Sequence, residues 1–513
     1  VDSGIDVFNA FFYDPDPSNT LESITGKTNL NHRKVIRIEP YADNTDPARG
    51  HGTHVAGTVA GNAFCTKNLC GISQYNGIAP ESKLYFSDIG DSSTGELSGK
   101  FDLQDQVKLF KELDVHISSN SWGYSYNIPE EDFAYNKIAY ENPDILYVFA
   151  AGNSQNYNTI NCPATAKNVL SIGATESPTS TILEFSITSA EIQNSTFSIE
   201  SQEFMTRIIN TQSKSDPMKY YVDLTAVMYD KNSQPNEYEG KIVIINDEIL
   251  ENDSEICTRS SEIESKGAVA GFYLPNISYY VCDPLPKIPL IMVSKSDINN
   301  ILQMGKISIL PFSGSETDIL PYVSYTSSKC PSDSCLLKPE LVAPGGNVYS
   351  ANSHGTDTEN VVVNTSFNDN VVRNSGTSMA TPAVSALAAL IRQYLKEGYY
   401  PYHKKNSGES INPSSTLLKA LLINTADKPK EDTFMPNLNE SKSEPRNDVG
   451  FGIPCLERAL GFNDIGLRFV DNEIMPSKSH KIYNLELNSN MADLNISMVY
   501  LDPPLNPENE ALF

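Results

Sequence analysis

A serine in the last third of the chain has the setting of an enzymatic nucleophile. Ser378 lies in the segment 376–382, Gly-Thr-Ser-Met-Ala-Thr-Pro, and small or apolar residues continue to Ile391. This pattern predicts a buried helix that begins at the serine, with Pro382 near its first turn, where a missing N–H costs least. Unpaired N–H groups at that helix end would face the negative charge that develops when a serine attacks a carbonyl. An ordinary helix N-cap is the alternative for Gly-Thr-Ser alone, so the assignment depends on partner residues.

A histidine between two glycines is the candidate base. The segment 49–61, Arg-Gly-His-Gly-Thr-His-Val-Ala-Gly-Thr-Val-Ala-Gly, places His51 at the start of a second small-residue helix. A histidine near its ordinary pKa can take the serine proton and pass it to a leaving amine, and glycines beside it allow a substrate backbone to approach. A metal site at His51 and His54 is the alternative. It lacks the intervening glutamate of a zinc-protease helix, and the chain has no Cys-x-x-Cys pair.

Two further polar residues complete the candidate set. The chain opens Val-Asp-Ser-Gly-Ile-Asp, and Asp2 would accept the second imidazole N–H and hold the base in its useful tautomer. Asp6 competes for this role, although it lies beyond the Asp-Ser-Gly tripeptide. The apolar segment 147–152 leads into Asn153, whose amide would donate to the oxyanion together with the Ser378 N–H. Each of these segments alone is typical of an ordinary turn.

Taken in chain order, the four residues resemble the site of the subtilisin-like serine peptidases, the subtilase family. The order Asp, His, Ser differs from those of chymotrypsin and the α/β-hydrolases. The resemblance implies that Ser378 attacks the peptide carbonyl, His51 acts as base and then acid, and Asp2 orients His51. It implies that Asn153 binds the oxyanion. The segment 119–123 resembles the strand that pairs with the substrate backbone, so the expected substrate-binding residues are Ser121, Trp122, Gly123, Ala151 and Gly152.

The remaining pattern predicts an α/β fold. Strand-like runs at 84–86 and 146–150 alternate with helical patterns at 103–113 and 131–140, which predicts a parallel sheet with helices on both faces. With the resemblance, the expected fold class is a subtilisin-like sheet whose catalytic domain comprises residues 1–180 and 322–465. Further segments resemble the family outside the four motifs, namely 75–80, 338–345, 415–426 and 450–452.

Two other regions have patterns of their own. Residues 181–321, roughly 140 residues, interrupt the catalytic domain where the family needs only a short connection. Their order of strand, helix, strand, strand is a small α/β pattern that resembles the protease-associated domain. Residues 466–513 contain two apolar runs, 482–487 and 494–501, which predict antiparallel strands. They resemble the start of a β-sandwich, which one or two strands cannot close.

Composition restricts the partners and the compartment. The formal net charge is −26, which disfavours nucleic acid and suits a soluble extracytoplasmic or vesicular protein. The resemblance to the subtilase family implies that the partners are protein or peptide substrates. The longest apolar run, 383–391, is too short to span a bilayer, so membrane attachment would need segments outside this chain. The chain starts at Val1 without an initiator Met or a signal peptide, and we expect a piece of a longer protein. No cofactor is expected in the chemistry. Calcium is frequent in the family, but no ligand set is assigned.

The cysteines favour an oxidising compartment. Their even number, eight, and the lack of metal-type spacing predict disulfides and a secreted, vesicular or cell-surface protein. Cys162 and Cys455 are left either as a bridge or as free thiols. The expected short-range pairs are Cys65 with Cys70, Cys257 with Cys282, and Cys330 with Cys335. Acceptor sequences for N-glycosylation occur at Asn194, Asn252, Asn276, Asn364, Asn439 and Asn495, some of them by chance in a chain rich in asparagine.

Two other functions compete with peptidase activity. A catalytically silent scaffold could bind peptides through the insertion and the C-terminal region, but it has no chemical need for all four polar residues. An esterase or peptide ligase would use the same triad with a different second nucleophile. The sequence predicts a serine endopeptidase and leaves open its side-chain preference and its oligomeric state.

Overall fold

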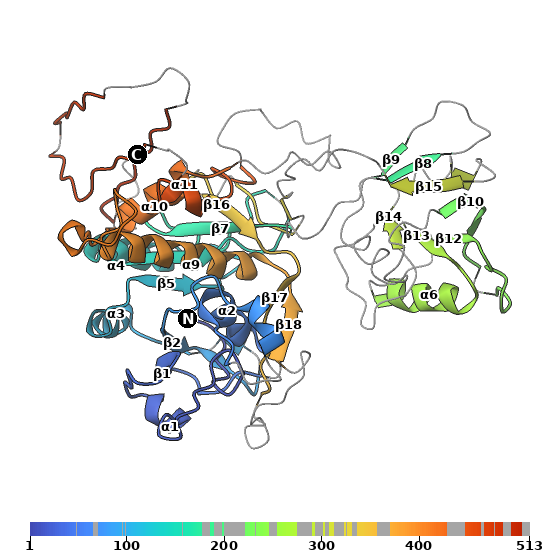
Figure 1. The fold of residues 1–513 in the computed structure, drawn as a ribbon, viewed down its shortest axis with the longest axis horizontal. Helices are drawn as coiled ribbons and strands as arrows, with labels where there is room; N and C mark the ends of the chain where they lie inside the picture. Colours follow the sequence, from blue (N-terminus) through green and yellow to red (C-terminus); the bar gives the residue numbers. More distant parts are fainter. Residues whose placement is uncertain are drawn as a thin grey trace. The chain divides into compact units, whose positions relative to one another are not determined.

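The protein is described by a computed structural model whose chain divides into two compact units. One comprises residues 1–177, 320–432 and 437–513, and the other residues 178–319 and 433–436. Figure 1 shows the elements of each unit. The residues that the structure describes are 1–176 except 48, 65–69, 95, 98 and 156, then 185–188, 197–199, 221–230, 232–245, 254–273, 290–292, 301–302, 307–311, 323–324, 326–330, 336–355, 370–427, 447–462, 466–476, 478–485 and 494–504.

The first unit is built on a four-stranded parallel sheet in the order β16-β7-β6-β5. Its strands are β5 (Ile117–Asn120), β6 (Leu146–Ala150), β7 (Leu170–Thr175) and β16 (Leu341–Pro344). All residues of β6 and β7 are buried, as expected for parallel strands covered on both faces. The predicted parallel sheet is therefore confirmed.

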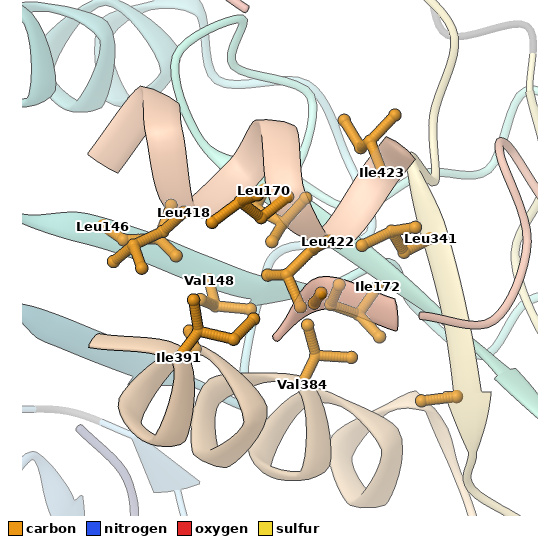
Figure 2. Packing of buried hydrophobic residues seen from close by; sticks show 14 of the residues in the cluster. Leu146, Val148, Leu170, Ile172, Leu341, Val384, Ile391, Leu418, Leu422 and Ile423 are labelled. Atoms are coloured by element: carbon orange, nitrogen blue, oxygen red, sulfur yellow. The ribbon is translucent and has the colours of Figure 1, made fainter. Parts of the chain in front are cut away.

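Side chains of β6 alternate between two layers of helices. Leu146 and Val148 belong to a buried cluster with α9 (Thr377–Lys396) and α10 (Ser415–Asn424), shown in Figure 2. Tyr147 and Phe149 point the other way, into a cluster with α3 (Leu103–Glu112) and α4 (Pro129–Glu141). Successive residues of a strand face opposite sides, so one apolar run supplies both cores. The helices therefore cover both faces of the sheet, as predicted.

Elements outside the main sheet carry the chain start and the two small-residue helices. The parallel pair β1 (Val35–Pro40) and β2 (Leu84–Asp88) continues through a bridge from Asp2 to Asp88. Helix α2 (His51–Ala60) packs against α9 and against the hairpin of β17 and β18. This packing joins the segments of the predicted base and nucleophile. The smaller elements are α1 (Leu21–Ile24), η1 (Cys70–Tyr75), β3 (Gly90–Asp91), β4 (Glu96–Leu97), β17 (Val348–Ala351), β18 (Val371–Asn374), η4 (Ser407–Glu409) and α11 (Leu456–Ala459).

The second unit contains two four-stranded sheets. One is parallel in the order β11-β12-β13-β14, and the other is antiparallel in the order β10-β15-β8-β9. Helix α6 (Ser254–Ser265) lies between β12 and β13 in the chain. The strands are β8 (Phe185–Thr188), β9 (Phe197–Ile199), β10 (Tyr221–Leu224), β11 (Ala226–Met228), β12 (Ile242–Ile245), β13 (Ala270–Tyr273), β14 (Leu290–Met292) and β15 (Ile307–Pro311).

The end of the chain differs from its predicted antiparallel strands. Residues 481–485 and 494–504 form no strand. A strand needs a neighbour for its backbone hydrogen bonds, and this segment instead bonds to side chains elsewhere in the first unit. The Asp502 N–H donates to the Asn168 side chain at 2.9 Å, and the Asn424 amide donates to the Ser497 hydroxyl at 3.1 Å.

Within the described ranges, we find no helix with the length and apolar character needed to cross a membrane.

Candidate active site

Asp2 and His51 are in direct contact. Asp2 is held beside β2, where its N–H donates to the Ser87 carbonyl at 3.1 Å. His51 is the first residue of α2, so its side chain projects from the start of that helix. The Nδ1–H of His51 donates to Oδ1 of Asp2 across 2.7 Å. This contact fixes the tautomer in which the Nε2 lone pair can accept a proton.

Burial and charge act in opposite directions on this pair. The side chain of Asp2 is 2% exposed and that of His51 is 39% exposed. Burial alone would raise the pKa of Asp2, but His51 and the Ser3 N–H hold it below its usual value. Burial alone would lower the pKa of His51, but the Asp2 carboxylate raises it above its usual value. Asp2 is therefore an anion at neutral pH, and His51 is a stronger base than an ordinary histidine.

A second buried carboxylate fastens the first loop to the start of α2. Asp46 accepts hydrogen bonds from the Ser3 hydroxyl at 2.8 Å and from the Thr53 N–H at 2.9 Å. Burial raises the pKa of Asp46 to about 6. A Cβ at Gly50 would lie 2.1 Å from this carboxyl. Gly50 therefore makes room for Asp46, and the approach of a substrate backbone at this glycine stays a prediction.

His54 is committed to the core. It is fully buried, and its Nε2–H donates to the Val348 carbonyl of β17 at 3.0 Å. Burial lowers the pKa of His54 to about 4. The described residues include no group of three or more His, Cys, Asp or Glu that could hold a metal ion. His54 therefore fastens α2 to the hairpin.

We expect His54→Gln to reduce the loss of unfolding free energy that occurs when the pH is lowered from 6.5 to about 4. The folded state keeps His54 neutral down to about pH 4, whereas the unfolded chain binds a proton near the ordinary value of 6.5. Unfolding therefore takes up a proton between these values, and stability falls by about 3 kcal/mol as pH drops through this window. Gln keeps an N–H donor but cannot titrate. Urea unfolding followed by fluorescence of the single tryptophan, Trp122, tests this; equal slopes in both proteins would contradict it.

Ser378 lies at the start of α9 and is held by a neighbouring carbonyl. It is the second residue of the helix, and its hydroxyl donates to the Ser121 carbonyl at 3.1 Å. The hydrogen bonds of the described residues do not include one between Ser378 and His51. Contacts of this kind often tighten only when substrate binds. Pro382 is the sixth residue of α9, further into the helix than the first turn that the sequence predicted.

The amide of Asn153 is oriented by the residue before the serine. Its Oδ1 accepts hydrogen bonds from the Thr377 N–H at 2.9 Å and from the Thr377 hydroxyl at 3.1 Å. The Thr377 hydroxyl in turn accepts the Gly152 N–H at 3.2 Å. Two donors at one atom identify that atom as the amide oxygen. The NH₂ group of Asn153 therefore remains for an acceptor outside this pair.

The five predicted substrate-binding residues lie at one edge of the sheet. Residues 121–123 follow β5, Ala151 and Gly152 follow β6, and these parallel strands are neighbours. The carboxyl ends of neighbouring parallel strands meet at the same edge, where ligands bind in open α/β sheets. The Asn161 side chain lies between the two segments. A Cβ at Gly123 would lie 2.9 Å from its Cβ, and one at Gly152 would lie 2.6 Å from its Oδ1.

Several site residues were missed at the sequence level. Asp46, Thr377 and Asn161 reach the site through contacts between segments far apart in the chain. Thr377 had a signal, because it is a polar residue next to the predicted nucleophile. Asp46 and Asn161 had none, since acidic and amide residues are common in loops.

The structure gives the bonding state of two of the cysteines discussed above. Cys162 is a buried free thiol and Cys455 a half-buried one, which decides between the two alternatives left for them. Each of the three predicted short-range disulfides has at least one side chain outside the described residues.

Comparison with known proteins gives one family match. The model of the subtilase family matches residues 1–452. The serine protease/ABC transporter B family proteins tagD and tagA of Dictyostelium discoideum are 29% and 25% identical, over 83% and 99% of this chain and 20% and 25% of their own lengths. The minor extracellular protease Vpr of Bacillus subtilis is 21% identical over 88% of this chain and 54% of its own. The chain thus spans a fifth to a quarter of the two Dictyostelium relatives and about half of Vpr.

Proposed function

Because the chain belongs to the subtilase family, we propose that it is a serine endopeptidase that uses Ser378 as its nucleophile. The observation that carries this proposal is the 2.7 Å contact between His51 and the buried Asp2. That contact prepares a base on α2, the helix that packs against the serine helix α9. The substrates are proteins or peptides, as for other peptidases of this family.

In the proposed reaction, the Ser378 hydroxyl turns from the Ser121 carbonyl to Nε2 of His51. His51 takes its proton as Oγ attacks the peptide carbonyl, and Asp2 stabilises the imidazolium that forms. The same proton then passes to the departing amine, and water releases the acyl group by the reverse sequence. The Asn153 NH₂ group and the Ser378 N–H at the helix start stabilise the oxyanion.

We expect Asn153→Ala to lower kcat by ~10² to 10³ with little change in KM, a magnitude known from another member of this family. The loss arises because the amide donates to an oxyanion that exists only in the transition state. Asn153→Asp is the matched variant, since it keeps the acceptor for Thr377 and loses the donor. Steady-state kinetics on a peptide substrate measure both, and a kcat near wild type in either would remove Asn153 from the mechanism.

The reaction class is tested by the products. Full-length protein incubated with a denatured protein should create new peptide N-termini, which mass spectrometry maps. Hydrolysis of a simple ester without new termini would favour the esterase alternative. The same cleavage map would give the side-chain preference at the scission site.

The inserted unit and the location are further parts of the proposal. The parallel β11-β12-β13-β14 sheet with α6 supports a protease-associated type of insertion. The name of the extracellular relative Vpr, together with the acidic charge of this chain, supports an extracytoplasmic protein.

A further inference from the structure

Helix α9 carries a proline where it removes a hydrogen bond from the nucleophile. In an α-helix the N–H of residue 382 would donate to the carbonyl of residue 378. Pro382 has no N–H, so the carbonyl of Ser378 loses its helix partner. A carbonyl that is shielded from water and left without a donor destabilises the local backbone, here the backbone of the half-buried Ser378.

The hydroxyl of Ser121 takes the place of the missing donor. Its Oγ donates to the Ser378 carbonyl at 2.8 Å, and Ser121 is 4% exposed. The Ser378 hydroxyl donates to the Ser121 carbonyl at 3.1 Å in return. Each serine therefore binds the backbone of the other through its side chain. A displacement of Ser121 would move both the backbone and the hydroxyl of Ser378.

A second pair of serines links β5 to α9 at a point two helical turns away from the nucleophile. Ser119 and Ser121 are two residues apart, which places their side chains on the same side of an extended chain. The hydroxyls of Ser385 on α9 and Ser119 on β5 form a hydrogen bond at 3.0 Å. Ser378 and Ser385 are two turns apart and lie on one helix face. β5 and the residue that follows it therefore contact α9 at two places, and only the Ser121 contact involves Ser378.

From this geometry we infer that the Ser121 hydroxyl is a positioning residue for Ser378, by replacing the hydrogen bond that Pro382 removes. The inference rests on the proposed function of Ser378 as the nucleophile. It gives Ser121 a second role in addition to its predicted binding of the substrate backbone. A hydroxyl that contacted substrate alone would alter KM and leave the intrinsic reactivity of the serine unchanged. A positioning hydroxyl alters kcat and the rate at which Ser378 reacts with a small reagent.

The test combines Ser121→Ala with a second substitution in the helix that restores a donor for the Ser378 carbonyl. Ser121→Ala is expected to lower kcat and the rate of labelling by a small fluorophosphonate about tenfold, with KM within about twofold. Adding Pro382→Ala supplies a backbone N–H for the Ser378 carbonyl and should recover most of both rates. Ser121→Cys keeps a weaker donor and should fall between wild type and Ser121→Ala.

Two controls separate the possible failures. Ser385→Ala removes a hydroxyl from the same helix face without touching Ser378, and both rates should stay within about twofold of wild type. Wild-type labelling in Ser121→Ala, or no recovery in the double variant, would overturn the inference. Activity that survives in Ser378→Ala would instead overturn the proposed function on which it rests.

Discussion

Ser378→Ala is expected to abolish peptide hydrolysis, with kcat lower by about 10⁶-fold, a magnitude known from another member of this family. The hydroxyl is the attacking group, and Ala leaves the oxyanion donors and the substrate edge without a nucleophile. The fold should survive, because α9 is held by its apolar face and by the Ser121 hydroxyl, which binds the Ser378 backbone. Hydrolysis of a fluorogenic peptide at saturating concentration measures the loss.

Ser385→Ala is the matched control for this change. It is the same substitution on the same helix. The Ser385 hydroxyl is hydrogen-bonded to the Thr381 carbonyl and to the Ser119 hydroxyl. It should keep kcat within about twofold and show the same melting temperature as Ser378→Ala within a few degrees. A variant lacking the Ser378 hydroxyl that still cleaves at more than a thousandth of the wild-type rate would mean that another group attacks.

Asp2→Asn is expected to lower kcat by about 10⁴-fold, the size of the effect when the aspartate of such a triad is replaced. Asn presents an N–H where Asp2 accepts the Nδ1–H of His51, which favours the wrong tautomer. The variant should also move the acid limb of the pH profile to lower pH. Asp2 raises the pKa of His51, which must be neutral to accept the serine proton, so removing the carboxylate lowers that pKa.

Asp6→Asn is the control that separates the two candidate aspartates. Asp6 accepts hydrogen bonds from the Phe8 N–H at 2.9 Å and from the His354 ring at 2.6 Å. Asp6 therefore binds His354, whereas Asp2 binds His51. Asp6→Asn should lower the free energy of unfolding and leave the acid side of the pH profile of kcat nearly unchanged. A larger loss of kcat in Asp6→Asn than in Asp2→Asn would reverse the assignment.

Much of the first unit could be predicted because local pattern and tertiary packing agree there. The run Leu146 to Ala150 is apolar on both faces, and both faces are buried. The contact between Asp2 and His51 could be predicted because the order Asp, His, Ser along the chain resembles that of the subtilase family. The apolar runs near the end of the chain were predicted as strands, but their described residues, 482–485 and 494–501, form no strand.

The details that position the chemistry depend on long-range contacts. Ser121 was predicted as a substrate residue, and its hydroxyl lies on the Ser378 carbonyl 257 positions away. Thr377 looked like part of a helix cap, yet its hydroxyl orients Asn153. Spacing along the chain cannot show such contacts, because they arise when α9 packs onto the ends of β5 and β6. Pro382 was visible, but the donor that replaces its N–H was not.

The central claim is that Ser378 is the reacting nucleophile. It is tested most directly by treating the full-length protein with a fluorophosphonate and locating the adduct by peptide mass spectrometry. We predict a single adduct on Ser378, formed in parallel with the loss of peptidase activity and absent from Ser378→Ala. An adduct on another residue that abolishes activity, or labelling that persists in Ser378→Ala, would contradict the account.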